Sequence, residues 1–283
     1  QAKELSECCL SIKDDQRILI FNNPSNPTGA LYTDQEIKDL ATVCKKENII
    51  IISDEIYAQV NFSGRDYVGF HKYYPEGTMI TSGLSKSHAA GGYRLGFIAL
   101  PEGMETVMKC LCAMISETFS AVSAPIQYAA LETYCGDYDL IRYVDRCTQI
   151  HGAASLYLYD RFISMGLNCP RPEGAFYLFP DFSNFKEKLK IKGLTDGLAL
   201  SKHLIENFHV ALLPGEDFYY PAEHFCCRIA SVDYDGAYVY QQSLQSLFEG
   251  KGEATLDNIF IEKYCPNLKL GCDEIEIFLK SLG

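Results

Sequence analysis

Two short apolar runs stand out in the first part of the chain, within residues 17–22 and 49–53. Runs of aliphatic and β-branched residues without polar alternation are typical of parallel strands that are buried on both faces. Between the two runs, apolar residues recur with helical spacing, at Ile37, Leu40, Ala41 and Cys44. The pattern therefore predicts a strand–helix–strand unit whose helix ends near Glu47.

The start of that helix carries a second signal, in Thr33 and Glu36. A threonine followed three residues later by a glutamate favours a capping box, in which each side chain accepts a bond from the other residue's backbone N–H. Two further strands are expected at 78–82 and at 95–100, the latter ending before Pro101.

Helices are expected to dominate the middle of the chain. One spans about 102–115, a second has Pro125 in its first turn and runs to about Tyr134, and a long third covers about 138–165, where Gly166 closes it. Strands that alternate with helices in this way are typical of an α/β domain.

The last part of the chain mixes strands and helices differently. The expected elements are a strand at 175–180, a helix capped by Thr195 and ending near Phe208, strands at 209–213 and 227–232, and surface helices at 236–249 and 272–281. The sequence thus predicts an α/β fold, with a mostly parallel sheet carrying helices on both faces and a smaller α+β C-terminal domain. The predicted boundaries are 1–150 and 151–283, and residues 1–16 are expected to be helical or loose.

Composition argues against several classes of protein. The 283 residues carry a formal net charge of −12 with no basic run, which argues against a nucleic-acid surface. No apolar stretch approaches the roughly 20 residues that a membrane span needs. The twelve cysteines contain no C-x-x-C spacing, so buried thiols in a reducing, cytoplasmic protein are favoured over a disulfide framework or a metal site.

The candidate chemistry centres on Lys86. It ends the segment Ser82-Gly83-Leu84-Ser85-Lys86, and Arg94 follows eight positions later. A lysine can form a Schiff base with an aldehyde cofactor, while hydroxyl groups and an arginine can hold a phosphate beside it. These residue types together indicate pyridoxal phosphate (PLP) chemistry, in which the cofactor supplies the electron sink.

Polar residues also follow the first two apolar runs. Asn26 lies just after the first run, and Asp54 and Tyr57 lie just after the second. In open α/β sheets, ligands bind at the carboxyl ends of strands. Asp54 is suited to hold the pyridine nitrogen of PLP protonated, and Asn26 and Tyr57 are suited to bond its phenolate oxygen. The plainer readings are a helix cap for Asp54, a core position for Tyr57, a turn residue for Asn26 and a surface ion pair for Arg94.

With these motifs the chain resembles the class I/II aminotransferases, which have the fold-type I PLP fold. The matching elements, in the family's order, are Asn26-Pro27-Thr28-Gly29, the Asp54-x-x-Tyr57 pair, the Lys86 segment with Arg94, Gly174-Ala175-Phe176-Tyr177, and Cys227-Arg228-Ile229-Ala230. The resemblance implies that Lys86, Asp54 and Tyr57 are catalytic. It implies that Asn26, Asp54, Tyr57, Ser85, Lys86 and Arg94 bind PLP, and that Arg228 with Asn26 binds the substrate carboxylate. It also implies a homodimer acting on an amino acid and a 2-oxo acid.

Two departures from the family pattern are visible. Gly83 stands where the family often has a serine, so one phosphate donor is missing or is replaced by Ser82. The turn at Asn26 also comes much earlier in this chain than in the family. We therefore expect the large domain to be truncated, without the family's glycine-rich phosphate turn and its ring-stacking aromatic residue.

The resemblance implies that Lys86, once released from the cofactor, moves the substrate Cα proton as acid and base in turn. Two alternatives stay open from the sequence. One is another PLP reaction on the same scaffold, such as that of a β-elimination lyase or an aminocyclopropane carboxylate synthase-like enzyme. The other is a catalytically silent fragment or partner-binding remnant.

Overall fold

A computed structural model describes residues 1–11, 16–248 and 253–283. The chain divides into two compact units. The first consists of Gln1–Pro24 and Leu31–Asp145, and the second of Ser25–Ala30 and Arg146–Gly283. The assignment of 1–150 to a cofactor-binding domain and of 151–283 to a small domain stays a prediction.

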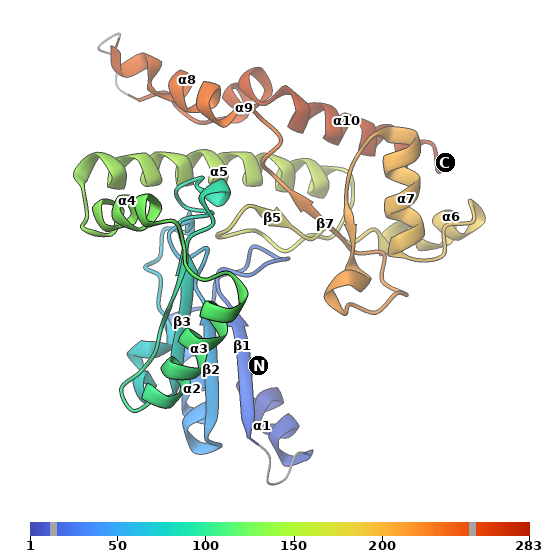
Figure 1. Cartoon of the computed structure of the whole chain (residues 1–283). Helices are drawn as coiled ribbons and strands as arrows, with labels where there is room; N and C mark the ends of the chain where they lie inside the picture. The colour runs from blue at the N-terminus through green and yellow to red at the C-terminus, as the bar shows by residue number, and fades with distance from the viewer. Residues whose placement is uncertain (12–15, 249–252) are drawn as a thin grey trace. The chain divides into compact units, whose positions relative to one another are not determined.

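The first unit is built on a four-stranded sheet (Figure 1). Strands β1 (Arg17–Asn22), β2 (Ile49–Asp54) and β3 (Thr78–Gly83) are parallel, and β4 (Gly96–Ala99) pairs with β3 in the antiparallel sense. The four predicted strands are confirmed. The register pairs Asn22 with Asp54 at the carboxyl ends of β1 and β2.

Helices α1 (Ala2–Ser11) and α2 (Asp34–Lys46) belong to the same unit. The predicted capping box is confirmed, because the Glu36 N–H donates to Thr33 Oγ1 at 3.3 Å and the Thr33 N–H donates to Glu36 Oε2 at 2.8 Å. Apolar side chains of α2 pack with one face of the sheet in a core formed by Cys9, Phe21, Ile37, Leu40, Ala41, Cys44, Ile49, Ile51, Phe70 and Tyr74.

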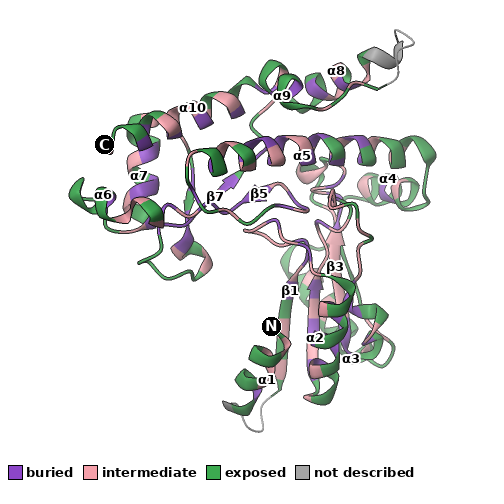
Figure 2. Cartoon of the chain, turned by 180° about the vertical axis from the view of Figure 1, so that it is seen from behind, coloured by how far each residue is buried: buried purple, intermediate pink, exposed green. Residues whose placement is uncertain are grey.

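The opposite face of this sheet is only loosely covered. Helix α3 (Glu105–Thr118) has no buried residue, as Figure 2 shows. A cavity of about 490 Å³ is lined by strand and helix residues that include Ile98, Met108 and Ile115. Ile18 and Ile20 of β1 are 61% and 74% exposed, and alternate residues of β2 are half-buried. The prediction that 49–53 is buried on both faces is therefore wrong, because no helix of the described residues packs closely on the second face.

Two further helices follow α3. Helix α4 (Ala124–Tyr134) has Pro125 in its first turn, as predicted, where proline's missing N–H has no helical partner to lose. Helix α5 (Tyr138–Ser164) confirms the long predicted helix. Gly166 follows it with a φ of +83°, in the left-handed region that glycine adopts readily, and so ends the helix.

The second unit holds a small antiparallel sheet with the strand order β5-β7-β6. The strands are β5 (Tyr177–Leu178), β6 (Leu213–Pro214) and β7 (Cys227–Ala230). Strands β5 and β7 are shorter than predicted. The strand predicted at 209–213 is wrong over 209–212, because His209 still ends α7, in the left-handed conformation with a φ of +57°. The α5 residues of this unit pack with the sheet, and the shared core includes Tyr157, Phe162, Leu178, Ile229 and Phe278.

The helices of the second unit are α6 (Lys186–Ile191), α7 (Gly197–Phe208), α8 (Gly236–Phe248), α9 (Asn258–Tyr264) and α10 (Pro266–Lys280). Helices α6 and α9 were not predicted from the sequence. Helix α10 begins at Pro266, earlier than the helix predicted at 272–281, and that prediction was wrong in placing the helix on the surface. Its buried residues are Leu268, Cys272, Ile275, Phe278 and Leu279. The last residue of the helix predicted at 236–249 lies outside the described residues.

The cap of α7 was assigned to the wrong residue. Asp196, not Thr195, is the N-cap, and its carboxylate accepts the Ala199 N–H at 2.8 Å. The Thr195 hydroxyl instead donates to Asp196 Oδ2 at 2.9 Å. A carboxylate in this position also carries negative charge at the positive end of the helix dipole.

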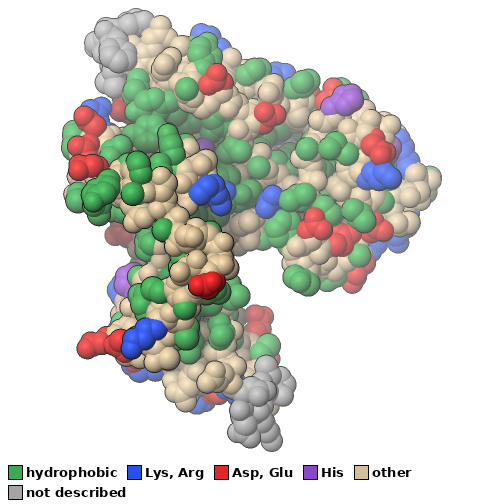
Figure 3. Space-filling view, in the orientation of Figure 1, with side chains coloured by type: hydrophobic (Ala, Val, Ile, Leu, Met, Phe, Trp, Pro, Cys, Tyr) green, Lys and Arg blue, Asp and Glu red, His purple; other side chains and the backbone are tan. Residues whose placement is uncertain are grey.

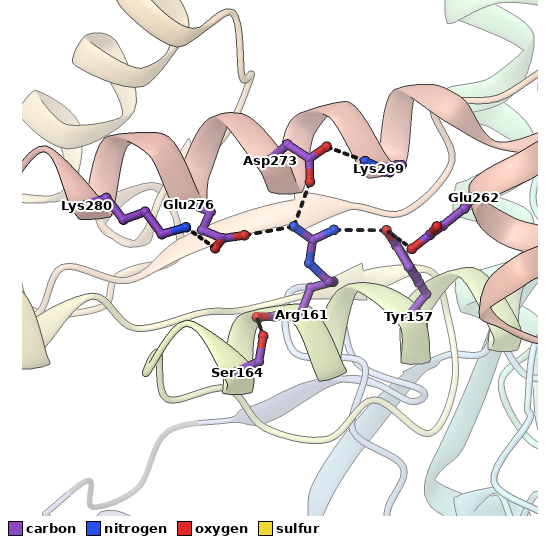
Figure 4. Close-up of polar contacts among 8 residues, drawn as sticks. All are labelled: Tyr157, Arg161, Ser164, Glu262, Lys269, Asp273, Glu276 and Lys280. Atoms are coloured by element: carbon purple, nitrogen blue, oxygen red, sulfur yellow. Dashed lines mark hydrogen bonds and ion pairs between the residues drawn. The ribbon is translucent and has the colours of Figure 1, made fainter.

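Arg161 of α5 joins that helix to α10 through several polar bonds (Figure 4). Its Nη2 donates to Asp273 Oδ1 at 2.7 Å and to Glu276 Oε2 at 3.2 Å, and its Nη1 donates to the Tyr157 hydroxyl at 3.0 Å. Lys269 and Lys280 pair with the same two carboxylates from within α10. Arg161 is thus a structural arginine whose charge is matched by neighbouring acids.

Charged side chains are dispersed over the face drawn in Figure 3, where basic and acidic groups alternate without a continuous basic patch. Among the described residues, no helix is both long and apolar enough to span a bilayer.

Candidate active site

The predicted site residues fall into two groups, one in each unit. Asp54, Tyr57, Ser85, Lys86 and Arg94 belong to the first unit, and Asn26 and Arg228 belong to the second.

Asp54 is the last residue of β2, and two groups orient its carboxylate. The Asn22 side chain donates from Nδ2 to Asp54 Oδ2 at 3.2 Å, and the Ile56 N–H donates to Asp54 Oδ1 at 3.2 Å. Burial raises the pKa of Asp54, while these two bonds oppose the rise. A partly buried carboxylate of this kind favours a cationic partner such as a protonated pyridine nitrogen.

Tyr57 and Lys86 lie close together. The Lys86 Nζ is 5.9 Å from the centroid of the Tyr57 ring, and Tyr57 is buried. A turn that begins at Glu55 brings Tyr57 back towards the sheet, since the Ala58 N–H donates to Glu55 O and the Val60 N–H donates to Tyr57 O. The structure therefore places the predicted Schiff-base lysine beside one predicted partner of the phenolate oxygen.

Arg94 is exposed, and its Nη1 donates to Gly91 O at 2.8 Å. The backbone of Gly91 also approaches Ser85, because a Cβ at Gly91 would lie 3.6 Å from Ser85 O. Arg94 has a φ of +56°, a left-handed conformation that non-glycine residues adopt only when the surroundings impose it. Ser85 and Arg94 thus flank the same short turn after Lys86.

Gly83 has a steric reason to replace the family's usual serine. A Cβ at this position would lie 2.6 Å from Leu95 O and 3.0 Å from Gly96 Cα, because β4 passes close by. The neighbouring Ser82 hydroxyl donates to Glu55 O at 3.2 Å. Since a serine hydroxyl has one proton to donate, this bond leaves Ser82 without a second donor for a phosphate.

In the second unit, Asn26 and Arg228 meet directly. Arg228 Nη1 donates to Asn26 Oδ1 at 3.0 Å, and the guanidinium carbon lies 4.5 Å from the Tyr177 ring centroid and 5.1 Å from the Phe218 ring centroid. The buried Nε of Arg228 has no hydrogen-bond partner among the described residues. A guanidinium that contacts two aromatic rings and keeps an unused buried N–H is suited to a carboxylate.

The turn that carries Asn26 is fixed by backbone bonds. The Gly29 N–H donates to Ser25 O, and Gly29 O accepts the N–H groups of Glu173 and Gly174. Gly29 has a φ of +69°, and a Cβ there would lie 2.7 Å from Tyr177 O. Glycine is therefore required at this position both by conformation and by space.

Comparison with known proteins assigns the family. The family profile "Aminotransferase class I and II" matches residues 4–233. The chain belongs to the class I and II aminotransferases. It is 34% identical over 212 residues to an aspartate aminotransferase of Bacillus subtilis, covering 74% of this chain and 52% of that protein. It is 32% identical over 210 residues to a probable N-acetyl-LL-diaminopimelate aminotransferase of the same organism.

Solved structures agree on the fold. An aromatic aminotransferase of Pyrococcus horikoshii superposes with a TM-score of 0.77 at 24% identity, over 98% of this chain and 63% of that one. An aspartate aminotransferase of Thermus thermophilus crystallised with maleate gives a TM-score of 0.74 at 22% identity, over 98% of this chain and 59% of that one. The predicted fold-type I architecture is confirmed, and the chain spans about half the length of the curated relatives that it matches.

Three site features were missed from the sequence. Asn22 is the last residue of β1 and pairs in register with Asp54, the last residue of β2. Aligning the ends of the two predicted strands would have indicated this pair. Tyr177 lies in a motif that was noted without a role, and Phe218 carries no local signal at all. Both are found only through their contacts with Arg228.

The residues present fit PLP by their chemistry. Lys86 supplies an amine beside a phenol, Asp54 supplies an oriented carboxylate, and Ser85 and Arg94 supply donors suited to phosphate. Class I and II aminotransferases are PLP-dependent enzymes, so family and donor set agree.

Proposed function

We propose that the protein is a PLP-dependent aminotransferase that moves an amino group between an L-amino acid and a 2-oxo acid. The observation that carries this proposal is the Lys86 amine beside the Tyr57 ring, in a unit where Asp54 is oriented by Asn22 at the end of β2. Bound PLP would supply an electron sink for the charge that develops at the substrate Cα.

We assign the binding and proton-transfer roles to residues of the chain. Lys86 Nζ would hold the cofactor and, once released, would accept and return the substrate Cα proton. Asp54 would face the pyridine nitrogen and favour its protonated form, and Tyr57 and Asn26 would donate to the phenolate oxygen. Ser85 and Arg94 would bind the phosphate, and Arg228, helped by Asn26, would bind the substrate carboxylate.

Names of relatives suggest the first substrate to test. Several relatives are aspartate aminotransferases, among them those of Bacillus subtilis and Geobacillus stearothermophilus. This chain matches about half the length of each of these two. We therefore propose L-aspartate as the first amino donor to examine.

We further propose a cytoplasmic homodimer. All twelve cysteines are free thiols, which suits a reducing compartment. The loosely covered sheet face, with Ile18 and Ile20 exposed, gives apolar surface that association would bury.

The test is to incubate the chain with millimolar PLP and L-aspartate, and to measure pyridoxamine phosphate, oxo acid and ammonia. Aminotransfer predicts oxo acid and pyridoxamine phosphate in equal amounts. In a parallel incubation with L-serine, whose Cβ carries a hydroxyl leaving group, pyruvate and ammonia without pyridoxamine phosphate would instead establish a β-elimination lyase. Asp54→Asn is the matched variant, and we expect it to slow the reaction by orders of magnitude, because an amide cannot stabilise a protonated pyridine.

A further inference from the structure

Glu55 follows Asp54 directly and occupies a buried site that the proposed mechanism does not use. Its side chain is 11% exposed. Ser53 Oγ donates to Glu55 Oε1 at 3.0 Å, so Glu55 points to the side of the strand where Ser53 is buried, and Asp54 points to the other side with Asn22. The end of β2 thus carries one acid towards each face of the sheet.

The segment 67–71 packs against the Glu55 carboxylate. His71 Nδ1 lies 3.9 Å from Glu55 Oε1, and a Cβ at Gly69 would lie only 2.6 Å from the same oxygen. The Tyr67 phenol oxygen is buried beside the carboxylate, close enough to influence its pKa although outside strict hydrogen-bond geometry. Glycine at position 69 is therefore what allows the segment to approach this closely.

The backbone of Glu55 is tied to β3. Its N–H donates to Thr81 O at 2.8 Å, and its carbonyl accepts the Ser82 hydroxyl at 3.2 Å. Ser82 lies four residues before Lys86, so Glu55 links the turn of Asp54 and Tyr57 to the strand from which the Lys86 segment departs.

We propose that Glu55 is a positioning residue, whose buried side chain clamps the 54–57 turn onto segment 67–71 and thereby fixes the orientation of Asp54 and Tyr57. This inference rests on the proposed function. The polar groups that face Glu55 are Ser53, Tyr67 and His71, and Asp54 is a charged neighbour that points to the other side of the strand. Burial raises the pKa of Glu55, which favours the neutral form and lessens repulsion with the neighbouring Asp54 carboxylate.

The test compares Glu55→Ala with Glu55→Gln, which keeps the size and one acceptor oxygen. Hydrogen exchange of the chain without cofactor is the first readout. We expect Glu55→Ala to speed amide exchange at least tenfold in peptides covering 54–58 and 67–71, while α2 exchanges as before. Glu55→Gln should restore most of the protection. Glu76→Ala, which removes an exposed acid paired with Lys45, is the control and should change neither region.

The second readout is a pH titration of the absorbance of PLP bound to Lys86. The midpoint of this titration depends on the contacts that Tyr57 and Asp54 make with the cofactor. We expect Glu55→Ala to shift this midpoint and Glu55→Gln to bring it back. If Glu55→Ala does not fold, Ser53→Ala removes one bond of the clamp and should give a smaller change in the same direction. Wild-type exchange and an unshifted midpoint in these variants would overturn the inference. A wild-type chain that never attaches PLP at Lys86 would instead overturn the proposed function, which leaves the two failures distinguishable.

Discussion

Arg161 and Arg228 lie in the same unit, and their partly buried guanidinium groups have different kinds of partner. Arg161 donates to two carboxylates and a phenol that join α5 to α10, so its charge is matched (Figure 4). Arg228 lies close to two aromatic rings, donates to the neutral Asn26, and keeps a buried Nε unpartnered among the described residues.

The different partners of the two arginines suggest that Arg161 serves stability and Arg228 serves ligand binding. An arginine with acidic partners is costly to remove, because the acids are left without a matching charge, and it has few donors left for a ligand. An arginine with aromatic and neutral partners retains its charge and its N–H donors for an incoming carboxylate. We therefore expect substitutions at the two positions to affect different measurements.

The largest expected effect is on substrate binding in Arg228→Lys. A lysine cannot present two parallel N–H groups, and charge-assisted bonds contribute about 1.5–3 kcal/mol each. We expect kcat/KM for the amino acid to fall about a hundredfold. The control is Arg161→Lys, which should leave kcat/KM close to wild type. Equal losses in both variants would break the comparison.

The second effect is on unfolding free energy in Arg161→Met. This change removes a cation from Asp273 and Glu276 while keeping much of the side-chain volume. Both carboxylates are about one-third exposed, so we expect a loss of about 1–3 kcal/mol rather than the larger penalty of a fully buried pair. Urea unfolding of Arg228→Met provides the matched control. We expect less than about 1 kcal/mol there, because no carboxylate of the described residues pairs with Arg228.

The third prediction concerns how the unfolding free energy depends on pH through Asp273, a partner of Arg161. Bonds from Lys269 and then Arg161 lower the pKa of Asp273 below 3.8. A carboxyl group whose folded pKa is depressed contributes stability that is present above its unfolded pKa and is lost as pH falls through the folded pKa. Wild type should therefore lose more stability on acidification below about pH 4 than Asp273→Asn does. Parallel curves for the two proteins would show that Asp273 carries no such linkage.

The smallest effect expected is that of Phe218→Leu. The ring lies 5.1 Å from the Arg228 guanidinium, and a cation–π contact at a partly exposed site contributes about 0.5–1 kcal/mol. We expect a two- to fivefold fall in kcat/KM with kcat nearly unchanged. A fall of more than tenfold would mean that the ring contacts substrate itself.

Local sequence signals predicted the elements that depend on local physics. The apolar runs gave β1 to β4, and Thr33 with Glu36 gave the capping box of α2. The competing cap at Asp196 was missed because two adjacent residues, Thr195 and Asp196, both suit the position. The short helices α6 and α9 carry too few turns for a clear period.

Features that depend on tertiary contacts could not be predicted in this way. The exposed face of β1 follows from which helix packs closely against the sheet, and an apolar run does not specify that. For the site, motifs pointed to Lys86, Asp54 and Arg228, whose roles stay predictions. Asn22, Phe218 and Glu55 were not singled out, because strand register and loop closure bring them to their partners.

The proposed function depends on attachment of PLP to Lys86. Borohydride reduction of the chain with millimolar PLP, followed by peptide mapping with mass spectrometry, measures this attachment. We expect a pyridoxyl group on Lys86 and no label at this site in Lys86→Ala. A stable label on another lysine, with Lys86 unmodified, would contradict the claim.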